Sequence, residues 1–460
     1  MTKTRIFAVC LSIFFFAAIA PALVLYAQGW RLDAARSTFV QTGALYINTN
    51  VRGGSAITDR GIHKNMAPFS SDVLIRNLLP GQTRVRIEKS GYFPWEKDVR
   101  IESERTLRFT NALLRPEKQA IVEGMPQLND TIGDFFVSPD GTKVALLTKT
   151  GLTRIWDRTK AAFLDIDIPD IPSGWSSDSA SVLIQQKNRA LRISIAPNPD
   201  HPLPATVQGI QNAGFVGNDP LFMVGTIAQR NGTATLASAR YNSDTNIFTL
   251  KEIARNISAA TISGKRIVFI DIGGILWSVL PDGNELVQLT TSPVPDIPDI
   301  ALITHSENER AIAAQNKNGT IWIFSFEEKG WRRVGDNIRT AIFSPDADKL
   351  LLIAENELTI HFLTETHNPD HAAYSNELIT RLSAPIQNAW WHHQNEHILF
   401  TIAGELHMSE LDGRGGRNDM LLAKDFVSAF PVQKNELTAL LIPNRIDFII
   451  NPALENFFGL

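Results

Sequence analysis

Beyond residue 119 the sequence repeats about every 40 residues, and this repeat constrains the fold more than any other feature of the chain. Its clearest copy, FFVSPDGTKVALLTKTGLTRIWD (135–157), predicts a strand, a Ser-Pro-Asp-Gly turn, an apolar strand, a short turn and a third strand. Related units contain Ser344-Pro345-Asp346 and Ser176-Ser177-Asp178. A unit of this size cannot bury an apolar face alone, so neighbouring units must pack against one another.

A fourth strand follows the third in several units, for example at 285–289 and 378–382. Four strands in about 40 residues form one blade of a β-propeller, so residues 119–460 are expected to form such a ring. The units also resemble TolB-like and WD-repeat-like propellers in their Ser-Pro-Asp-Gly turn and the apolar strand after it. This resemblance implies a fold and no particular activity, because propellers host many unrelated functions.

The repeat also predicts a blade number and a way to close the ring. Eight blades are expected, with seven as the alternative, because first strands are predicted near residues 134, 173, 213, 259, 299, 340, 387 and 428. Residues 119–123 precede the first unit and have no blade of their own. Because an open ring would expose strand edges, we expect 119–123 to pair as the outer strand of the last blade.

Residues 43–115 show a different pattern, in which short alternating strands are separated by turns. Apolar residues occupy every second position at 84–88 and 98–102, the period of a half-buried strand. Between the strands, Leu79-Pro80-Gly81 predicts a turn, since proline presets φ and glycine accepts a positive φ. This part of the chain is therefore expected to form a small β-sandwich.

The segment IRNLLPGQTRVRIEKSGYFPWEKDV (75–99) resembles the PEGA domain, a small β-sandwich of surface and envelope proteins. The matching marks are Leu79-Pro80-Gly81, the alternating strand after it and the run from Gly91 to Glu96. Arg52-Gly53-Gly54-Ser55 departs from the Pro-Glu-Gly-Ala of the family. The resemblance implies an extracytoplasmic domain near a membrane anchor, without catalysis. Tyr92 and Trp95 either stack on a sugar or fill the sandwich core, and core packing is the favoured interpretation.

Residues 6–30 carry no charged side chain, and about 20 apolar helical residues suffice to cross a bilayer. We expect an uncleaved transmembrane anchor at 6–28, a cytoplasmic tail at 1–5 and all later residues outside the cytoplasm. A cleaved signal peptide is the alternative, but its apolar region is usually shorter. Lys3 and Arg5 favour a cytoplasmic N-terminus.

The composition excludes several classes of site. The 460 residues carry a net charge of −4, which gives no electrostatic footprint for nucleic acid. The single cysteine, Cys10, lies in the apolar run and allows neither an internal disulfide nor a thiolate zinc cluster. No cofactor is expected.

The side chains considered for a metal site are Glu405, His392, His393, His397 and His407. His392 and His393 occupy the position of the Ser-Pro-Asp-Gly turn, and neighbours along a strand point to opposite faces, so turn and strand roles are favoured. The preceding Trp390 and Trp391 take the places of Trp175 and Phe343, which indicates core packing. The acidic proline runs at 167–172 and 295–300 are interpreted as stiff linkers rather than cation sites.

No catalytic, cofactor-binding or metal-binding residue is assigned, and the ligand-binding residues are left unknown. The sequence predicts a single-pass, extracytoplasmic binding or scaffold protein of the cell envelope; its partner is left unknown, with an envelope protein or polysaccharide as the candidate. The alternative is a propeller-based hydrolase or lyase acting on envelope polysaccharide or peptide.

Overall fold

The computed structural model describes most of the chain in two compact units. Described are residues 3–33, 37–118, 121–166, 170, 172–187, 189–195, 205–216, 219–230, 232–242, 245, 247–263, 265–296, 300–305, 311–432 and 436–453. The first unit comprises Met1–Gln119, Glu410–Met420 and Pro452–Leu460, and the second comprises Ala120–Ser409 and Leu421–Asn451.

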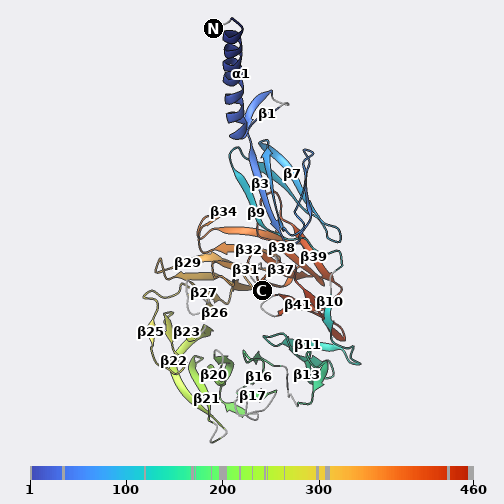
Figure 1. Ribbon diagram of the computed structural model, residues 1–460. Helices are drawn as coiled ribbons and strands as arrows, with labels where there is room; N and C mark the ends of the chain where they lie inside the picture. The colour runs from blue at the N-terminus through green and yellow to red at the C-terminus, as the bar shows by residue number, and fades with distance from the viewer. Residues whose placement is uncertain are drawn as a thin grey trace. The chain divides into compact units, whose positions relative to one another are not determined.

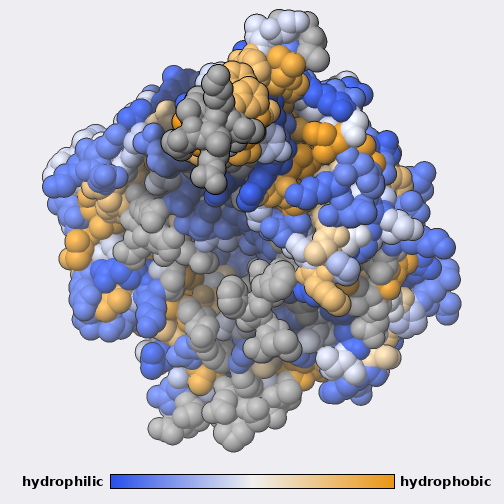
Figure 2. Space-filling model, turned by 45° about the horizontal axis from the view of Figure 1, so that its top comes forward, coloured by the Kyte–Doolittle hydropathy of each residue, from blue (hydrophilic) through white to orange (hydrophobic). Residues whose placement is uncertain are grey.

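The first unit begins with the helix α1 (Lys3–Ala27), drawn in dark blue in Figure 1. Large apolar side chains are exposed along it: Phe7, Val9, Leu11, Ile13, Phe14, Phe15, Phe16, Ile19, Leu23, Val24, Leu25 and Tyr26. The hydrophobic colour gathers over α1 in Figure 2. The expected anchor at 6–28 is thus helical through Ala27. Taken over the described residues, however, no helix is long and apolar enough to cross a membrane.

A short hairpin follows α1 and leads into two sheets. The hairpin is formed by β1 (Trp30–Asp33) and β2 (Thr38–Gln41). One sheet has the order β6 (Asp72–Leu78), β3 (Gly43–Thr49), β9 (Thr106–Ala112), and its β3–β9 pair is parallel. The other has the order β5 (His63–Asn65), β4 (Ser55–Thr58), β7 (Gly81–Glu88), β8 (Trp95–Ile101).

The two sheets share one apolar core, as a β-sandwich does. Alternate residues of β7 and β8 are buried, so Val85 and Ile87 face inward together with Trp95 and Val99. This alternation confirms the strands predicted at 84–88 and 98–102. The alternating pattern arises because successive side chains of a strand point to opposite faces of its sheet.

In its described residues the second unit has six four-stranded sheets and one seven-stranded sheet. The first two sheets are β11 (Ile132–Val137), β12 (Lys143–Thr148), β13 (Thr153–Asp157), β14 (Ala162–Leu164), and β15 (Gly174–Trp175), β16 (Ser181–Gln186), β17 (Arg189–Ser194), β18 (Ala205–Gln208). The seven-stranded sheet is β19 (Gln211–Val216), β20 (Asp219–Ala228), β21 (Ala234–Asn242), β22 (Ile247–Ser263), β23 (Arg266–Asp271), β24 (Leu276–Val279), β25 (Val287–Gln288).

The remaining sheets continue in chain order. They are β26 (Ile300–His305), β27 (Ala311–Asn316), β28 (Ile321–Ser325), β29 (Gly330–Gly335); β30 (Thr340–Phe343), β31 (Lys349–Ile353), β32 (Glu357–Phe362), β35 (Asn376–Arg381); and β36 (Ile386–Trp391), β37 (His397–Ile402), β38 (Glu405–Glu410), β39 (Asp419–Lys424). A small hairpin, β33 (Thr366–His367) and β34 (Asp370–His371), lies between β32 and β35. Neighbouring strands run antiparallel, as β11–β12 and β12–β13 do.

The last sheet joins the two ends of the second unit. Its order is β10 (Ile121–Gly124), β42 (Arg445–Ile450), β41 (Leu437–Ile442), β40 (Ser428–Val432). One apolar core joins this sheet to the first, through residues such as Phe135 and Trp156 on one side and Phe448 on the other. The predicted pairing with the last blade is confirmed for Ile121–Gly124, whereas 119 and 120 lie outside the described residues. Figure 1 shows the sheets following one another around a ring.

The seven-stranded sheet was not predicted. Its strand β22 is 17 residues long, pairs with β21 through its first half and pairs with β23 through its second. The first strand expected near 259 is therefore the second half of β22 rather than a separate element. The other predicted first strands coincide with β11, β15, β19, β26, β30, β36 and β40.

The Ser-Pro-Asp-Gly turn at 138–141 and its variants at Ser176 and Ser344 share the same hydrogen bonds. Ser138 Oγ donates to Asp140 Oδ1 at 2.6 Å and accepts from the backbone N–H of Lys143 at 2.9 Å. The carboxylate of Asp140 also accepts from the Thr142 backbone N–H at 2.9 Å. Ser176 makes the equivalent bonds to Asp178 and Ser181. A side chain that satisfies turn N–H groups explains why this short motif recurs at the same place in successive sheets.

Candidate functional site

The first unit contains a buried ion pair with several additional hydrogen bonds. Lys97 on β8 is paired with Glu410, and their side chains are 0% and 5% exposed. The Lys97 Nζ also donates to the backbone oxygens of Asp412 and Gly416, each at 2.6 Å. The indole Nε1 of Trp95 donates to Glu410 Oε2 at 3.3 Å. Buried charges persist in a fold when each is paired and hydrogen-bonded, and both conditions hold here.

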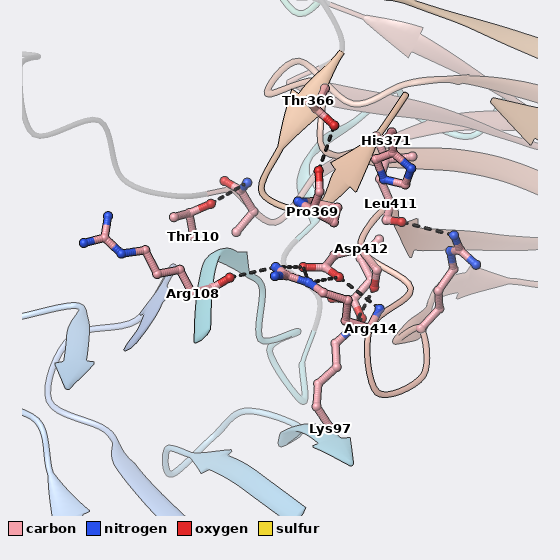
Figure 3. Close-up of polar contacts among 12 residues, drawn as sticks. Lys97, Arg108, Thr110, Thr366, Pro369, His371, Leu411, Asp412 and Arg414 are labelled. Carbon is pink, nitrogen blue, oxygen red and sulfur yellow. Dashed lines mark hydrogen bonds and ion pairs between the residues drawn. The ribbon is translucent and has the colours of Figure 1, made fainter. Parts of the chain in front are cut away.

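The same segment, Glu410–Met420, has further contacts inside the first unit. Figure 3 shows the guanidinium of Arg414 between the Asp412 carboxylate and the backbone oxygen of Arg108, to which Nη2 donates at 2.7 Å. Asn418 donates from its backbone N–H to Glu410 Oε1 at 2.7 Å and from Nδ2 to the Glu96 oxygen at 3.1 Å. Every contact of this set is structural: it fixes the segment against the sandwich, and the charges are neutralised.

The aromatic residues considered for sugar stacking belong to the sandwich core. Trp95 is 1% exposed and packs edge-on against Phe109, with 5.3 Å between the ring centroids. Tyr92 is partly exposed and packs against the same core. The interpretation as core residues is therefore confirmed for Trp95, whose face is closed to a sugar.

The histidines considered for a metal occupy turn and strand positions, as favoured. His392 takes the position of the serine in the repeated turn. Its backbone N–H donates to the backbone oxygen of His397 at 2.9 Å, just as the backbone N–H of Ser138 donates to the backbone oxygen of Lys143. His407 lies apart on β38, where it contacts Glu405 at 3.2 Å and stacks on Phe400. Within the described part of the chain, no group of three His, Cys, Asp or Glu residues is placed to hold a metal.

The neighbouring tryptophans are core residues. Trp390 and Trp391 are 4% and 1% exposed, and the Trp391 indole donates to the Ile342 oxygen at 2.9 Å. This outcome confirms their predicted role. The acidic proline runs at 167–172 and 295–300 fall largely outside the described residues, which include only 170 and 172 of the first and 295, 296 and 300 of the second.

One buried titratable residue, His361 on β32, has no local sequence pattern that marks it. It is 2% exposed, and its Nδ1 lies 2.6 Å from Asn376 Oδ1. Asn376 Nδ2 donates to the Val334 oxygen, which turns its Oδ1 toward the ring and makes His361 Nδ1 the donor. Nε2 has no hydrogen-bond partner among the residues that the structure describes. Burial is the largest cause and lowers the pKa of His361. The hydrogen bond with Asn376 raises this pKa, and the positive charge of Arg332 lowers it further.

This histidine predicts a pH dependence of stability. Because folding lowers the pKa of His361, its contribution is complete above the ordinary pKa of about 6.5 and is lost as the pH falls below that value and through the lower pKa of the folded state. Urea unfolding at a series of pH values should show the loss, and His361→Gln should flatten the slope. His367, whose side chain is 82% exposed, is the matched control. An unchanged slope in His361→Gln would contradict the assignment.

The second unit carries an open pocket of about 560 Å³ on the β20–β22 part of the seven-stranded sheet. Its lining includes Phe222, Arg240, Tyr241, Lys251 and Asp282, and we call it the β21 pocket. The guanidinium of Arg240 lies 4.8 Å from the Phe222 ring centroid and 3.8 Å from Asp219. Lys251 Nζ donates to the backbone oxygen of Asp282 at 2.6 Å. Cations, a carboxylate and aromatic rings thus line one opening.

The turn that contains Asp282 stabilises the ionised form of its carboxylate. The backbone N–H of Asn284, the largest cause, lowers the pKa of Asp282; the Asn284 amide and the charge of Lys251 act in the same direction. The pocket therefore offers both hydrogen-bond donors and an ionised acceptor.

A second cavity, of about 610 Å³, lies on the same sheet. Small residues such as Gly214, Gly225, Ala259 and Ala260 line it. Polar side chains such as Asn212, Thr226 and Ser258 also line it, but its lining residues include no charged side chain, so the β21 pocket is the better candidate for a charged ligand.

Comparison with known proteins adds two likenesses of fold. The β-propeller domain of Myceliophteria thermophila Cps50 (Swd1) is 12% identical, and the match covers 73% of this chain and 100% of that domain, with a TM-score of 0.41. The Dos1 propeller is 10% identical, covering 71% of this chain and 94% of its own, with a TM-score of 0.49. No protein-family model matches the sequence, and no curated protein matches it. The second unit is a β-propeller on the ground of its own sheets and their closure.

Proposed function

We propose that this protein is a membrane-anchored, extracytoplasmic binding protein of the cell envelope. The observation that carries the proposal is α1, a 25-residue helix whose large apolar side chains are exposed from Phe7 to Tyr26. Exposing so much apolar surface to water is unfavourable by about 25 cal/mol for each Å², so such a surface calls for an apolar environment. A bilayer supplies it over residues 6–28, with residues 1–5 in the cytoplasm.

The remainder of the proposal concerns the two β-domains. The sandwich is a PEGA-like module, supported by the turn at Leu79-Pro80-Gly81 and by the run from Gly91 to Glu96. The propeller has eight blades. This number follows if the six four-stranded sheets count as one blade each and the seven-stranded sheet as two blades that share β22.

The propeller would bind its partner at the β21 pocket, and binding is favoured over hydrolysis or lyase chemistry. In this pocket, Arg240 lies near the Asp219 carboxylate, and Lys251 donates to the backbone oxygen of Asp282. Cationic donors of this kind recognise polar groups of a ligand. Envelope polysaccharide or an envelope protein segment has the required chemistry. Pockets carried on a rigid sheet scaffold are a common place for such recognition.

The proposed topology predicts the result of protease treatment of intact spheroplasts that express the protein with a C-terminal tag. The β-domains should be digested from outside, while a tag placed before residue 3 should survive until the membrane is lysed. Extraction at high pH should leave the chain in the membrane pellet. Protection of the β-domains before lysis would overturn the orientation, and release into the supernatant would overturn the anchor.

Binding at the β21 pocket predicts the effect of charge reversal. Arg240→Glu with Lys251→Glu should abolish retention of partners or envelope polysaccharide by the tagged protein, because both polar donors are lost. Arg333→Glu with Arg381→Glu is the matched control, since it changes net charge equally at exposed residues of β29 and β35. Equal loss in both variants would indicate a general charge effect and would exclude the pocket.

A further inference from the structure

The hairpin β1–β2 follows α1 with almost no intervening chain. The backbone N–H of Gly29 bonds to the Tyr26 oxygen at 3.2 Å, which ends the helix, and β1 starts at Trp30. The hairpin then closes on the same place, because the Thr42 N–H donates to the Gly29 oxygen at 3.0 Å. The hairpin is therefore held at the end of the apolar helix.

One face of this hairpin is apolar and exposed. Leu32 and Phe39 lie directly opposite each other on the two strands, and they are 57% and 67% exposed. Cross-strand partners share a face of the sheet, so the two side chains form one apolar surface. Asp33, the next residue along β1, points the other way and is 8% exposed.

Arg31 fixes how the hairpin is held against the helix and the sandwich. Its guanidinium lies 3.6 Å from the centroid of the Tyr26 ring, and Nη1 donates to the Tyr26 oxygen at 2.8 Å. Nη2 donates to Asn77 Oδ1, on β6, at 3.0 Å. A single side chain thus joins the last turn of α1, the hairpin and the sandwich, all within the first unit.

We propose that the hairpin β1–β2 lies in the interfacial layer of a lipid bilayer, with Leu32 and Phe39 turned toward the lipid. This inference rests on the proposed anchoring by α1. Lipid is the occupant that fits, because the exposed apolar pair lies on the hairpin that is held directly at the end of the exposed apolar helix α1. Tyr26, Trp30 and Arg31 also gather at the helix end, and aromatic and cationic side chains of this kind favour the membrane–water boundary. Two contacts with the bilayer, rather than one, would set the tilt of the sandwich.

Depth-dependent quenching in the full chain tests this inference. With Cys10→Ala removing the native thiol, single cysteines are introduced by Phe39→Cys, Phe16→Cys and Phe69→Cys and labelled with bimane. Each protein is reconstituted into phosphatidylcholine–phosphatidylglycerol vesicles with nitroxide lipids labelled near the headgroup or at mid-chain. Phe69, which is 82% exposed, is the matched control. It precedes Asp72, the first residue of β6, which pairs with Asn48. The hairpin instead adjoins Gly43, which pairs with Leu78 at the other end of β6.

The expected result is a loss of fluorescence at position 39 with headgroup-level nitroxide, at position 16 with mid-chain nitroxide, and at position 69 with neither. Position 39 behaving like position 69, while position 16 is quenched, would overturn the hairpin inference and leave the anchor intact. An unquenched position 16 would overturn the anchor itself. Disulfide formation between copies through position 39, in place of quenching, would show that a second copy covers the hairpin and would also overturn the inference.

Discussion

Deleting Ile121–Gly124 is expected to destabilise the whole propeller rather than one end of it. These residues form β10, the strand that pairs with β42 and completes the last sheet. The lost ladder, at about 1 kcal/mol for each hydrogen bond, and the opened ring should together lower the free energy of unfolding by about 3–6 kcal/mol. Urea unfolding followed by circular dichroism measures the change, and hydrogen exchange shows where protection is lost.

A substituted strand provides the control for this deletion. Ile121→Thr, Val122→Thr and Glu123→Lys keep the main chain, and Gly124 is retained because a Cβ there would meet the Asp447 carboxylate at 2.8 Å. If closure depends on main-chain pairing, the substituted protein should unfold near the wild-type midpoint. Loss of protection confined to β40–β42 after the deletion would mean that the ring does not depend on β10.

Lys97→Met is expected to destabilise the first unit strongly. The change removes the cation from Glu410, whose side chain is 5% exposed, and leaves a buried charge without its ionic partner. Breaking a buried pair in this way typically costs about 3–5 kcal/mol. Adding Glu410→Gln should recover part of the loss, since it removes the uncompensated charge. Thermal unfolding of the full chain checks both expectations.

An exposed ion pair on the same sheet is the control for Lys97. Arg84 on β7 and Asp98 on β8 pair at 2.8 Å, with side chains 61% and 59% exposed. Arg84→Met should change stability by less than about 1 kcal/mol, because solvent screens an exposed pair. Equal effects of the two substitutions would show that burial of the Lys97 pair contributes nothing.

The parts of the fold that follow from periodicity could be predicted. The strands β7 and β8 alternate in the sequence as they alternate in burial, and the Ser-Pro-Asp-Gly turns mark the same position in successive sheets. The role of Ile121–Gly124 followed from the rule that a ring avoids open edges. Each of these inferences depends on local pattern or on a general constraint, and both are visible in one sequence.

Features that depend on distant residues could not be predicted. The β3–β9 pair is parallel, and alternation does not report strand direction. The alternation of β8 does place Lys97 on the inward face with Trp95 and Val99, which indicates a buried cation. Its partner Glu410 is remote in sequence, and no local pattern connects them. The β21 pocket likewise combines residues from three strands and a turn, each ordinary when read alone.

The position of β10 also sets the order of events during synthesis. Ile121 pairs with Ile449, which is 328 residues further along the chain. At about 5–20 residues per second, the ribosome needs roughly 15–65 s to make that length. Throughout this interval β10 has been made but its partner strand does not exist, and an unpaired strand is a template for other chains. A chain that stops before residue 445 therefore cannot close the ring, however many of the preceding sheets it has completed.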